Sequence, residues 1–221
     1  MTTRQQGVCW KCGTAIGEVL VCAGCGAPQP TQSGADLFAV LGLARGLAID
    51  PGGLEARYHA AARTVHPDRY QTADAREREL SLVASATVNR AYRTLRDPVA
   101  RGRYWLELHG TALAERNAAV PPALAAEVFE TQEKLAELRG ATGAEAVALR
   151  SEVRGLHDAL AARLEGLRAA LVEQYARWNG DAAGALEELK RRLSEIAYLG
   201  TLLGDVEDAI GDGLRGTDHR H

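Results

Sequence analysis

The chain of 221 residues contains no run of eighteen consecutive apolar residues and few stretches rich in β-branched side chains. The first absence argues against a membrane-spanning helix, and the second argues against an extensive β-sheet. Aromatic residues make up only 5% of the chain, whereas hydrophobic residues make up 46%, with Ala, Leu and Arg prominent. This composition favours helices, and the length is sufficient for one or two domains with apolar cores.

A strong excess of charge of one sign is also lacking. The net charge of −3 is by itself too small to indicate a nucleic-acid or membrane partner. Residues 111–221 carry 13 Lys and Arg against 19 Asp and Glu, which argues against nucleic-acid binding in that part. Met1–Val8 has no apolar signal-peptide core, and no cysteine follows Cys25. We therefore expect a cytoplasmic protein without long-range disulfides.

The cysteines that are present form two copies of a Cys-x-x-Cys-Gly motif, at Cys9, Cys12, Cys22 and Cys25. Each copy places two thiolates on one side of a tight turn, and the following glycine tolerates the backbone angles needed there. Four such sulfurs are a typical tetrahedral ligand set for structural zinc. We predict a zinc ribbon over residues 7–28, with Val19–Val21 as one strand of a hairpin. The alternative to a purely structural role is a docking surface with Trp10 exposed.

Pro28–Gly34, rich in Pro, Gln, Ser and Gly, is a predicted linker to a second part that spans residues 36–110. Asp36 is a predicted N-cap of a short helix, and Asp50, followed by proline, is the predicted N-cap of a longer one. Two apolar stripes at helical spacing follow, Leu54, Tyr58, Ala61, Ala62 and Val65 in the first and Leu80, Ala84, Val88, Ala91 and Leu95 in the second. The sequence thus predicts two amphipathic helices, of which the second ends near Asp97.

The triplet His66-Pro67-Asp68 lies in the short loop between these two predicted helices. Three residues alone carry little information, so their context decides their meaning. An antiparallel helical hairpin with this triplet in its loop resembles the J domain, which docks on DnaK-type heat-shock chaperones and speeds their ATP hydrolysis. His66 would cap a helix end, and Asp68 would offer a carboxylate to a cationic group of the chaperone. Further candidate chaperone-binding residues around the loop are Arg57, Arg63 and Arg69.

Residues 122–211 carry three more apolar stripes. Their members are Leu124, Val128, Thr131, Leu135 and Leu138, then Leu149, Val153, Leu156, Leu160, Leu164, Leu167 and Leu171, then Leu186, Leu189, Leu193, Ile196 and Leu203. The breaks at residues 140–143 and 179–180 are short, which favours an antiparallel three-helix bundle within one chain. A coiled-coil homo-oligomer through the C-terminal helices is the alternative interpretation. We expect the tail after Gly211 to fray.

Three further segments carry a more specific resemblance. They are residues 85–95 (Ser-Ala-Thr-Val-Asn-Arg-Ala-Tyr-Arg-Thr-Leu), Pro98-Val99-Ala100-Arg101, and Glu133-Lys134-Leu135-Ala136-Glu137. Together with the J-type hairpin they resemble the HscB family of iron–sulfur co-chaperones, and the N-terminal cysteine ribbon resembles its eukaryotic-type branch. The resemblance implies that the C-terminal bundle binds an IscU-type iron–sulfur scaffold protein. It also implies that the J domain triggers ATP hydrolysis by a DnaK-type chaperone, which promotes cluster transfer.

Helical geometry places Phe129 and Tyr198 off the apolar stripes of their predicted helices. Glu130 and Glu133 lie beside Phe129, so an apolar group is rimmed by acidic ones, as in many binding sites. The candidate scaffold-binding residues implied by the resemblance are Ala125, Ala126, Phe129, Glu130, Glu133 and Tyr198. The family usually has two large apolar residues where this chain has the two alanines, and packing of either aromatic on a neighbouring element is the alternative.

The sequence therefore predicts a mainly all-α protein with a small zinc ribbon, a J domain and a C-terminal three-helix bundle. No Ser, Cys or second His lies near His66, and no His, Asp or Glu cluster accompanies the cysteines, so we expect a binding and delivery protein and no enzyme. The alternative function is that of a J-domain adaptor which delivers a different client to a DnaK-type chaperone.

Overall fold

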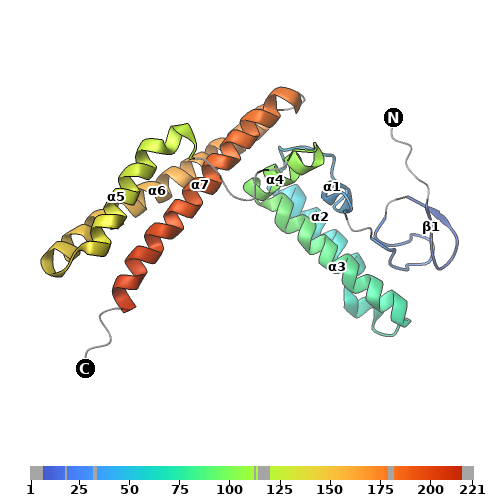
Figure 1. The fold of residues 1–221 in the computed structure, drawn as a ribbon. Helices are drawn as coiled ribbons and strands as arrows, with labels where there is room; N and C mark the ends of the chain where they lie inside the picture. Colours follow the sequence, from blue (N-terminus) through green and yellow to red (C-terminus); the bar gives the residue numbers. More distant parts are fainter. Residues whose placement is uncertain are drawn as a thin grey trace. The chain divides into compact units, whose positions relative to one another are not determined.

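The computed structural model describes residues 7–17, 19–31, 34–111, 113, 120–178 and 182–215, without the side chains of residues 182–184 and 212–215. The chain divides into two compact units, Met1–Tyr104 and Trp105–His221. Within the described ranges it is mainly helical and contains a single two-stranded sheet, as the composition predicts (Figure 1). Among the helices so described, none combines the length and the apolarity needed to cross a membrane.

The first unit begins with a small ribbon in which β1 (Gly7–Val8) pairs antiparallel with β2 (Ala15–Ile16). The prediction of a strand at Val19–Val21 is wrong, since Val21 forms only an isolated bridge with Pro28. The strand pair instead flanks the first cysteine turn. Two backbone hydrogen bonds close this turn, from Gly13 N to Cys9 O and from Cys9 N to Thr14 O. The glycine after each cysteine pair adopts a positive φ of 73° or 74°, as predicted from the motif.

The rest of the first unit is helical. Its elements are α1 (Leu37–Val40), α2 (Pro51–Val65), the 3₁₀ turn η1 (Pro67–Tyr70), α3 (Ala75–Arg96) and α4 (Pro98–Leu108), whose last residues belong to the second unit. The predicted caps are confirmed, because a carboxylate oxygen of Asp36 accepts a hydrogen bond from Phe38 N and one of Asp50 accepts from Gly53 N. Helices α2 and α3 pack against each other as the predicted hairpin.

Most of the predicted stripe of α3 is buried, together with Leu54 and Val65 of α2. Tyr58, Ala61 and Ala62 are only half-buried. Leu80 is also half-buried, and Ser81 takes the buried position next to it. A serine is tolerated there because its hydroxyl donates a hydrogen bond to Val65 O across the hairpin.

The second unit consists of η2 (Pro122–Leu124), α5 (Ala125–Gly140), α6 (Gly143–Arg177) and α7 (Ala182–Arg215). Helix α6 packs against both α5 and α7, so the three stripes meet within one chain (Figure 1). The ion pairs Lys134–Glu152 and His157–Glu207 join α6 to its two neighbours. The predicted break at residues 179–180 lies outside the described residues, and α7 continues past Gly211, where fraying was expected.

The core of the second unit follows the predicted stripes with four exceptions. All five predicted residues of the first stripe are buried. Leu156, Leu167, Leu186 and Leu203 are half-buried, and the buried positions include Tyr175, Leu199, Leu202 and Val206. On α7 the buried stripe therefore passes through Leu199, Leu202 and Val206 at spacings of three and four residues, and Leu203 lies beside it.

Candidate functional site

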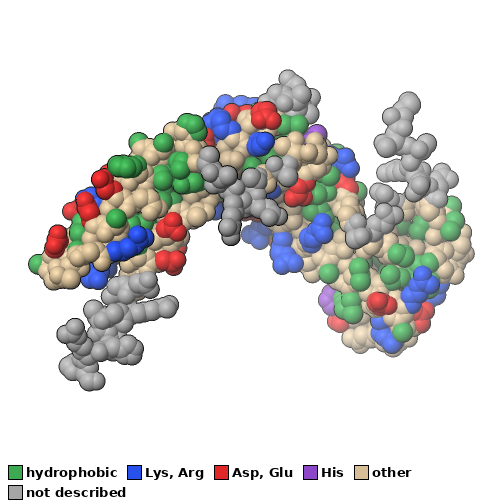
Figure 2. Space-filling view, in the orientation of Figure 1, with side chains coloured by type: hydrophobic (Ala, Val, Ile, Leu, Met, Phe, Trp, Pro, Cys, Tyr) green, Lys and Arg blue, Asp and Glu red, His purple; other side chains and the backbone are tan. Residues whose placement is uncertain are grey.

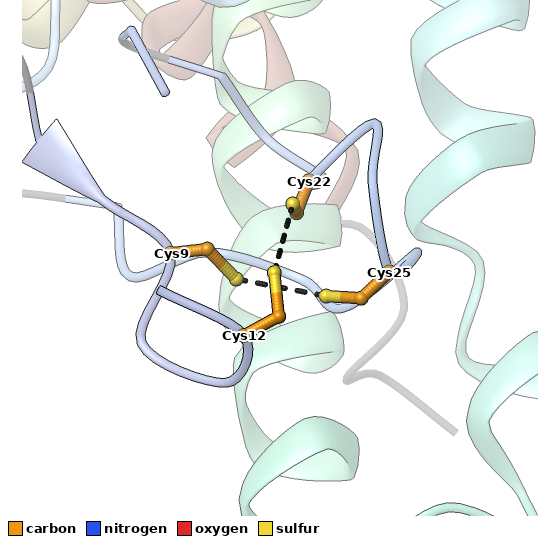
Figure 3. A group of neighbouring side chains, drawn as sticks. All are labelled: Cys9, Cys12, Cys22 and Cys25. Atoms are coloured by element: carbon orange, nitrogen blue, oxygen red, sulfur yellow. Dashed lines mark hydrogen bonds between the residues drawn. The ribbon is translucent and has the colours of Figure 1, made fainter. Parts of the chain in front are cut away.

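The four cysteine side chains of the ribbon point toward one another (Figure 3). All four sulfur atoms lie within 4.8 Å of one another, with 3.6 Å between Cys9 Sγ and Cys25 Sγ and 3.8 Å between Cys12 Sγ and Cys22 Sγ. Zinc–sulfur bonds of about 2.3 Å in a tetrahedron place sulfurs about 3.8 Å apart. A disulfide bond would need about 2.0 Å. The spacing therefore fits a tetrahedral metal ion and excludes disulfides among these cysteines.

The protonation equilibria of these thiols also favour a bound cation. Burial opposes a charge on Cys9, but backbone N–H groups of Cys12 and Lys11 outweigh it and lower the pKa of Cys9 to about 6. Conversely, although the backbone N–H of Ala27 favours its thiolate, burial and the neighbouring sulfurs raise the pKa of Cys25 to about 12. Without a cation the four groups cannot all be thiolates, whereas a divalent metal ion removes this repulsion. The cluster thus has the chemistry of a metal site.

Gln29 supports this cluster from outside the predicted ribbon. Its Nε2 donates hydrogen bonds to Cys9 Sγ at 3.3 Å and to Ala27 O at 2.8 Å. The composition placed this glutamine in a linker, but its side chain is buried. A glutamine in a Pro- and Ser-rich stretch gives no sequence signal for such a contact, which joins residues 20 positions apart. Hydrogen bonds to ligand atoms are a usual way to orient them.

Trp10, which lies between the first two cysteines, is half-buried and contacts other parts of the first unit. Its indole Nε1 donates a hydrogen bond to Pro28 O at 2.7 Å. The guanidinium carbon of Arg76 lies 4.2 Å from the ring centroid, the arrangement of a cation–π contact. The alternative in which Trp10 is an exposed docking residue is therefore disfavoured, because the ring makes contacts within the chain.

The His-Pro-Asp triplet has its side chains in solvent and its backbone in a fixed turn. His66 ends α2 and begins η1, and its Nδ1 accepts a hydrogen bond from Asp68 N at 3.3 Å, which is the capping role predicted for it. The side chains of His66 and Asp68 are 57% and 73% exposed, and Pro67 is half-buried. Gln71 Nε2 donates to Asp68 Oδ1 at 3.3 Å. The carboxylate of Asp68 is thus oriented yet accessible.

Hydrogen bonds from α3 and η1 hold the residues just before the triplet. The carbonyl of Val65, the last residue of α2, accepts hydrogen bonds from Ser81 Oγ at 2.8 Å and Ser85 Oγ at 2.9 Å. The carbonyl of Thr64 lies 3.1 Å from the donating Tyr70 OH. Carbonyls in the last turn of a helix have no partner within that helix, so these three hydroxyls satisfy them. The triplet therefore follows directly after a helix end that is fixed in place.

The three arginines predicted to meet the chaperone are all exposed. Arg63 lies in the last turn of α2, and Arg69 lies within η1. Arg57 lies earlier on α2, where its Nη1 donates a hydrogen bond to Gly42 O at 2.7 Å. The structure thus brings Arg63 and Arg69 to the loop and ties Arg57 to the turn after α1.

Helix α5 presents most of the predicted scaffold-binding residues to solvent. Those exposed on it are Ala125, Ala126, Phe129, Glu130 and Glu133. Phe129 is 68% exposed, which is unusual for so large an apolar side chain. Tyr198 is half-buried on α7, a helix that contacts α5. On the face shown in Figure 2, hydrophobic side chains gather over the second unit with acidic side chains beside them.

Ion pairs fix the surroundings of this α5 face. Arg163 of α6 pairs with Glu127, and Lys134 Nζ lies 3.0 Å from Glu137 and 3.1 Å from Glu152. Hydrogen bonds to Glu137 and Glu152 raise the pKa of Lys134, so this lysine stays charged. The acidic side chains of Glu130 and Glu133 remain exposed at the rim of Phe129.

Comparison with known proteins agrees with these features, although no protein-family model matches the chain. The "Iron-sulfur cluster co-chaperone protein HscB homolog" of Arabidopsis thaliana is 33% identical over 134 residues, which are 61% of this chain and 53% of that protein. The "Co-chaperone protein HscB homolog" of Bordetella pertussis is 44% identical over 119 residues, 53% of this chain and 69% of the relative. The chain thus spans about half the length of the plant relative.

Solved structures show the same architecture. The crystal structure of human co-chaperone protein HscB matches with a TM-score of 0.69 and 27% identity. The match covers 91% of this chain and 97% of the human one. Sequence identity, a fold shared along nearly the whole chain and the predicted motifs all agree: the protein belongs to the HscB family of co-chaperones, of which the Arabidopsis relative is named an iron–sulfur cluster co-chaperone.

Proposed function

We propose that the protein stimulates the ATPase of a DnaK-type heat-shock chaperone and delivers an IscU-type iron–sulfur scaffold protein to it. The observation that carries this proposal is the exposed His66-Pro67-Asp68 loop, held at the end of α2 by hydroxyl groups of α3 and η1. A loop used only as a connection would not need three hydrogen bonds from other elements, one buried and two partly buried, to fix its start. The names of the relatives support a co-chaperone in iron–sulfur cluster assembly.

The loop acts through directional contacts with the chaperone. Asp68 offers a carboxylate to a cationic group of the ATPase domain, and such a charge-assisted hydrogen bond is stronger than a neutral one. Arg63 and Arg69 lie beside it and steer the encounter with an acidic surface. Arg57, which lies on α2 like Arg63, adds a further positive charge to this surface, and the hydrogen bond to Gly42 O holds its guanidinium in place.

The face of α5 binds the scaffold protein. Phe129 supplies the apolar anchor, and Glu130 and Glu133 supply an acidic rim that selects a partner with basic residues. Tyr198 adds a second aromatic group from α7, and Ala125 and Ala126 line the approach to Phe129. Phe129 is 68% exposed, and an apolar group next to two exposed alanines and rimmed by acidic side chains has the composition of a binding surface.

The ion held by Cys9, Cys12, Cys22 and Cys25 is zinc in a structural role. Four sulfur ligands fill the tetrahedron and leave no open position for a substrate. When bound, zinc supplies the cross-link that this short ribbon uses in place of an apolar core. Backbone N–H groups and Gln29 orient the sulfurs around it.

Replacement of one atom in the loop tests the chaperone role. Asp68→Asn keeps the size of the side chain and an oxygen that can accept the hydrogen bond from Gln71 Nε2, but removes its charge. We expect this variant to lose nearly all stimulation of the chaperone's ATPase in single-turnover assays, with an unchanged circular dichroism spectrum. The matched control is Glu79→Gln, the same loss of charge at an exposed position of α3. Full stimulation by Asp68→Asn would refute the proposed function.

The exposed alanines favour a second candidate. Ala125 and Ala126 make the apolar face of α5 smaller than two large apolar residues would. A smaller face fits a J-domain adaptor whose client is not the scaffold protein. Calorimetric titration of the full chain with an iron–sulfur scaffold protein separates the two candidates, since only the first predicts micromolar or tighter binding.

A further inference from the structure

The two cysteine turns of the ribbon contact residues on either side of the short stretch that connects the His-Pro-Asp loop to α3. The second turn, Cys22–Gly26, contacts Tyr70 at the end of η1. The first turn, Cys9–Gly13, contacts the first residues of α3. The metal site therefore lies against one end of the proposed chaperone-binding loop, within a single unit of the chain.

Tyr70 makes the contact nearest to the triplet, two residues after Asp68. Its side chain is largely buried, with 7% of the residue exposed. Its hydroxyl lies 3.2 Å from Gly26 O and 3.1 Å from Thr64 O. A phenol has one proton to donate, so Tyr70 shares it between a carbonyl of the ribbon and a carbonyl of α2.

The carbonyl of Gly26 is positioned by the same hydrogen bonds that shape the second cysteine turn. Gly26 N donates to Cys22 O, and Cys22 N donates to Ala27 O, both at 2.9 Å. Gly26 needs its positive φ of 74° to close this turn, which presents Cys22 and Cys25 to the metal. The acceptor of Tyr70 therefore belongs to the same turn that presents Cys22 and Cys25 to the metal.

The first cysteine turn holds the other end of the connection. Lys11 Nζ lies 2.8 Å from Glu77 Oε1, and only 6% of Glu77 is exposed. A carboxylate so deeply buried depends on its cationic partner, and this partner belongs to the ribbon. The stacking of Arg76 over Trp10 adds a second contact at the same helix end.

We propose that Tyr70 is a positioning residue that couples metal occupancy of the ribbon to the conformation of the His66-Pro67-Asp68 loop. With the metal bound, the two cysteine turns hold Tyr70 and the start of α3 at fixed points, and the loop that precedes Tyr70 keeps one conformation. Without the metal these points are released, and the loop opens more often. The consequence for the chaperone rests on the proposed function, whereas the coupling itself belongs to this chain alone.

Amide hydrogen exchange on the full chain, zinc-loaded and after chelation, measures this coupling. The amide of Arg69 is the direct probe, because Arg69 N donates to His66 O across the loop. We expect chelation to accelerate exchange of the Arg69 amide roughly five- to tenfold, the effect of losing about one hydrogen bond. In Tyr70→Phe, which lacks the shared hydroxyl, exchange should already be fast and chelation should change it little.

Tyr104→Phe is the matched control. The hydroxyl of Tyr104 also makes two hydrogen bonds in the first unit, to Leu37 N and Asp36 Oδ1, but not to the ribbon. This variant should respond to chelation as the wild type does. An equal response of Tyr70→Phe and wild type would overturn the proposal. Equal acceleration at Val88, in the middle of α3, would also overturn it, because the metal would then stabilise the whole unit.

These results are independent of the proposed function. Unchanged exchange refutes the coupling and leaves the ATPase test of Asp68→Asn valid. Conversely, a chaperone that ignores Asp68→Asn refutes the proposed function, and the exchange of the Arg69 amide still decides the coupling.

Discussion

In the first unit, a four-sulfur cluster and buried hydrogen bonds position the residues proposed to meet the chaperone. In the second unit, apolar stripes on three helices form the core, and the residues proposed to meet the scaffold protein lie on the exposed face of α5, except for Tyr198 on α7. The first arrangement fixes a few atoms of a loop, as a directional contact with an ATPase domain requires. The second keeps a broad surface in place, as a protein interface requires.

The two arrangements differ in what damages them. The loop depends on a few hydroxyl groups, namely Tyr70 OH at the carbonyl of Thr64 and Ser81 Oγ and Ser85 Oγ at the carbonyl of Val65. The position of the α5 face depends on the fold of the whole bundle, and many buried leucines contribute to the stability of that fold. Substitutions in one unit should therefore leave the fold of the other unchanged, and the predictions below test this independence.

The largest effect is expected from loss of the metal site. Cys22→Ser removes one of four ligands, and metal binding at such a site contributes on the order of 10 kcal/mol to folding. The ribbon amides of residues 7–29 should lose their dispersed NMR signals and bound zinc should fall below one equivalent. Signals of α5, α6 and α7 should not move. A well-dispersed ribbon in metal-free protein would contradict the metal assignment.

The core of the second unit should show the next largest effect. Leu193 on α7 is 0% exposed, and Leu193→Ala should lower the free energy of unfolding of this unit by about 2–5 kcal/mol. Val147→Ala, at a position of α6 that is 65% exposed, is the control and should cost little. Denaturant unfolding followed by signals of each unit measures both changes. Equal destabilisation of the first unit would show that the two units do not unfold independently.

The smallest effect is expected from the polar contact between α6 and α7. Hydrogen bonds to Asp158 and Glu207 raise the pKa of His157 above its ordinary value of 6.5. Protonated His157 thus stabilises the folded state fully below pH 6.5, and this contribution is lost as the pH rises through the raised pKa. For a largely exposed pair it should stay below about 1 kcal/mol.

The difference in unfolding free energy between wild type and His157→Gln, measured from pH 5 to pH 9, reports this contribution. It should favour the wild type at low pH and vanish at high pH. A difference that grows with pH would mean that the neutral ring, and not the ion pair, makes the contact.

The residues that could be predicted from the sequence are those whose role is local. The cysteine pairs, the glycines after them, the caps at Asp36 and Asp50 and the His-Pro-Asp loop all depend on neighbours within a few positions. The exposure of Phe129 followed from helical spacing alone. The mainly helical fold with its three-helix bundle was predicted for the same reason, since spacing and short loops are local properties.

Other residues could not be predicted because their partners are distant in the sequence. Tyr70 meets Gly26 across 44 positions, and Gln29 meets Cys9 across 20. An exposed Trp10 stayed open as an alternative because nothing near it in the sequence indicates Arg76 as its partner. On the long helix α7 a one-residue error in the stripe moved the expected core from Leu202 to Leu203.

The central claim is that one chain joins a chaperone-stimulating loop to a scaffold-binding face. Single-turnover ATP hydrolysis by the DnaK-type chaperone, measured with this protein, with the scaffold protein and with both, tests it most directly. We predict that the two together stimulate more than the sum of their separate effects. Combined Phe129→Ala and Tyr198→Ala should reduce the joint effect to the sum while this protein's own stimulation persists. Purely additive stimulation by the wild-type protein would contradict the claim.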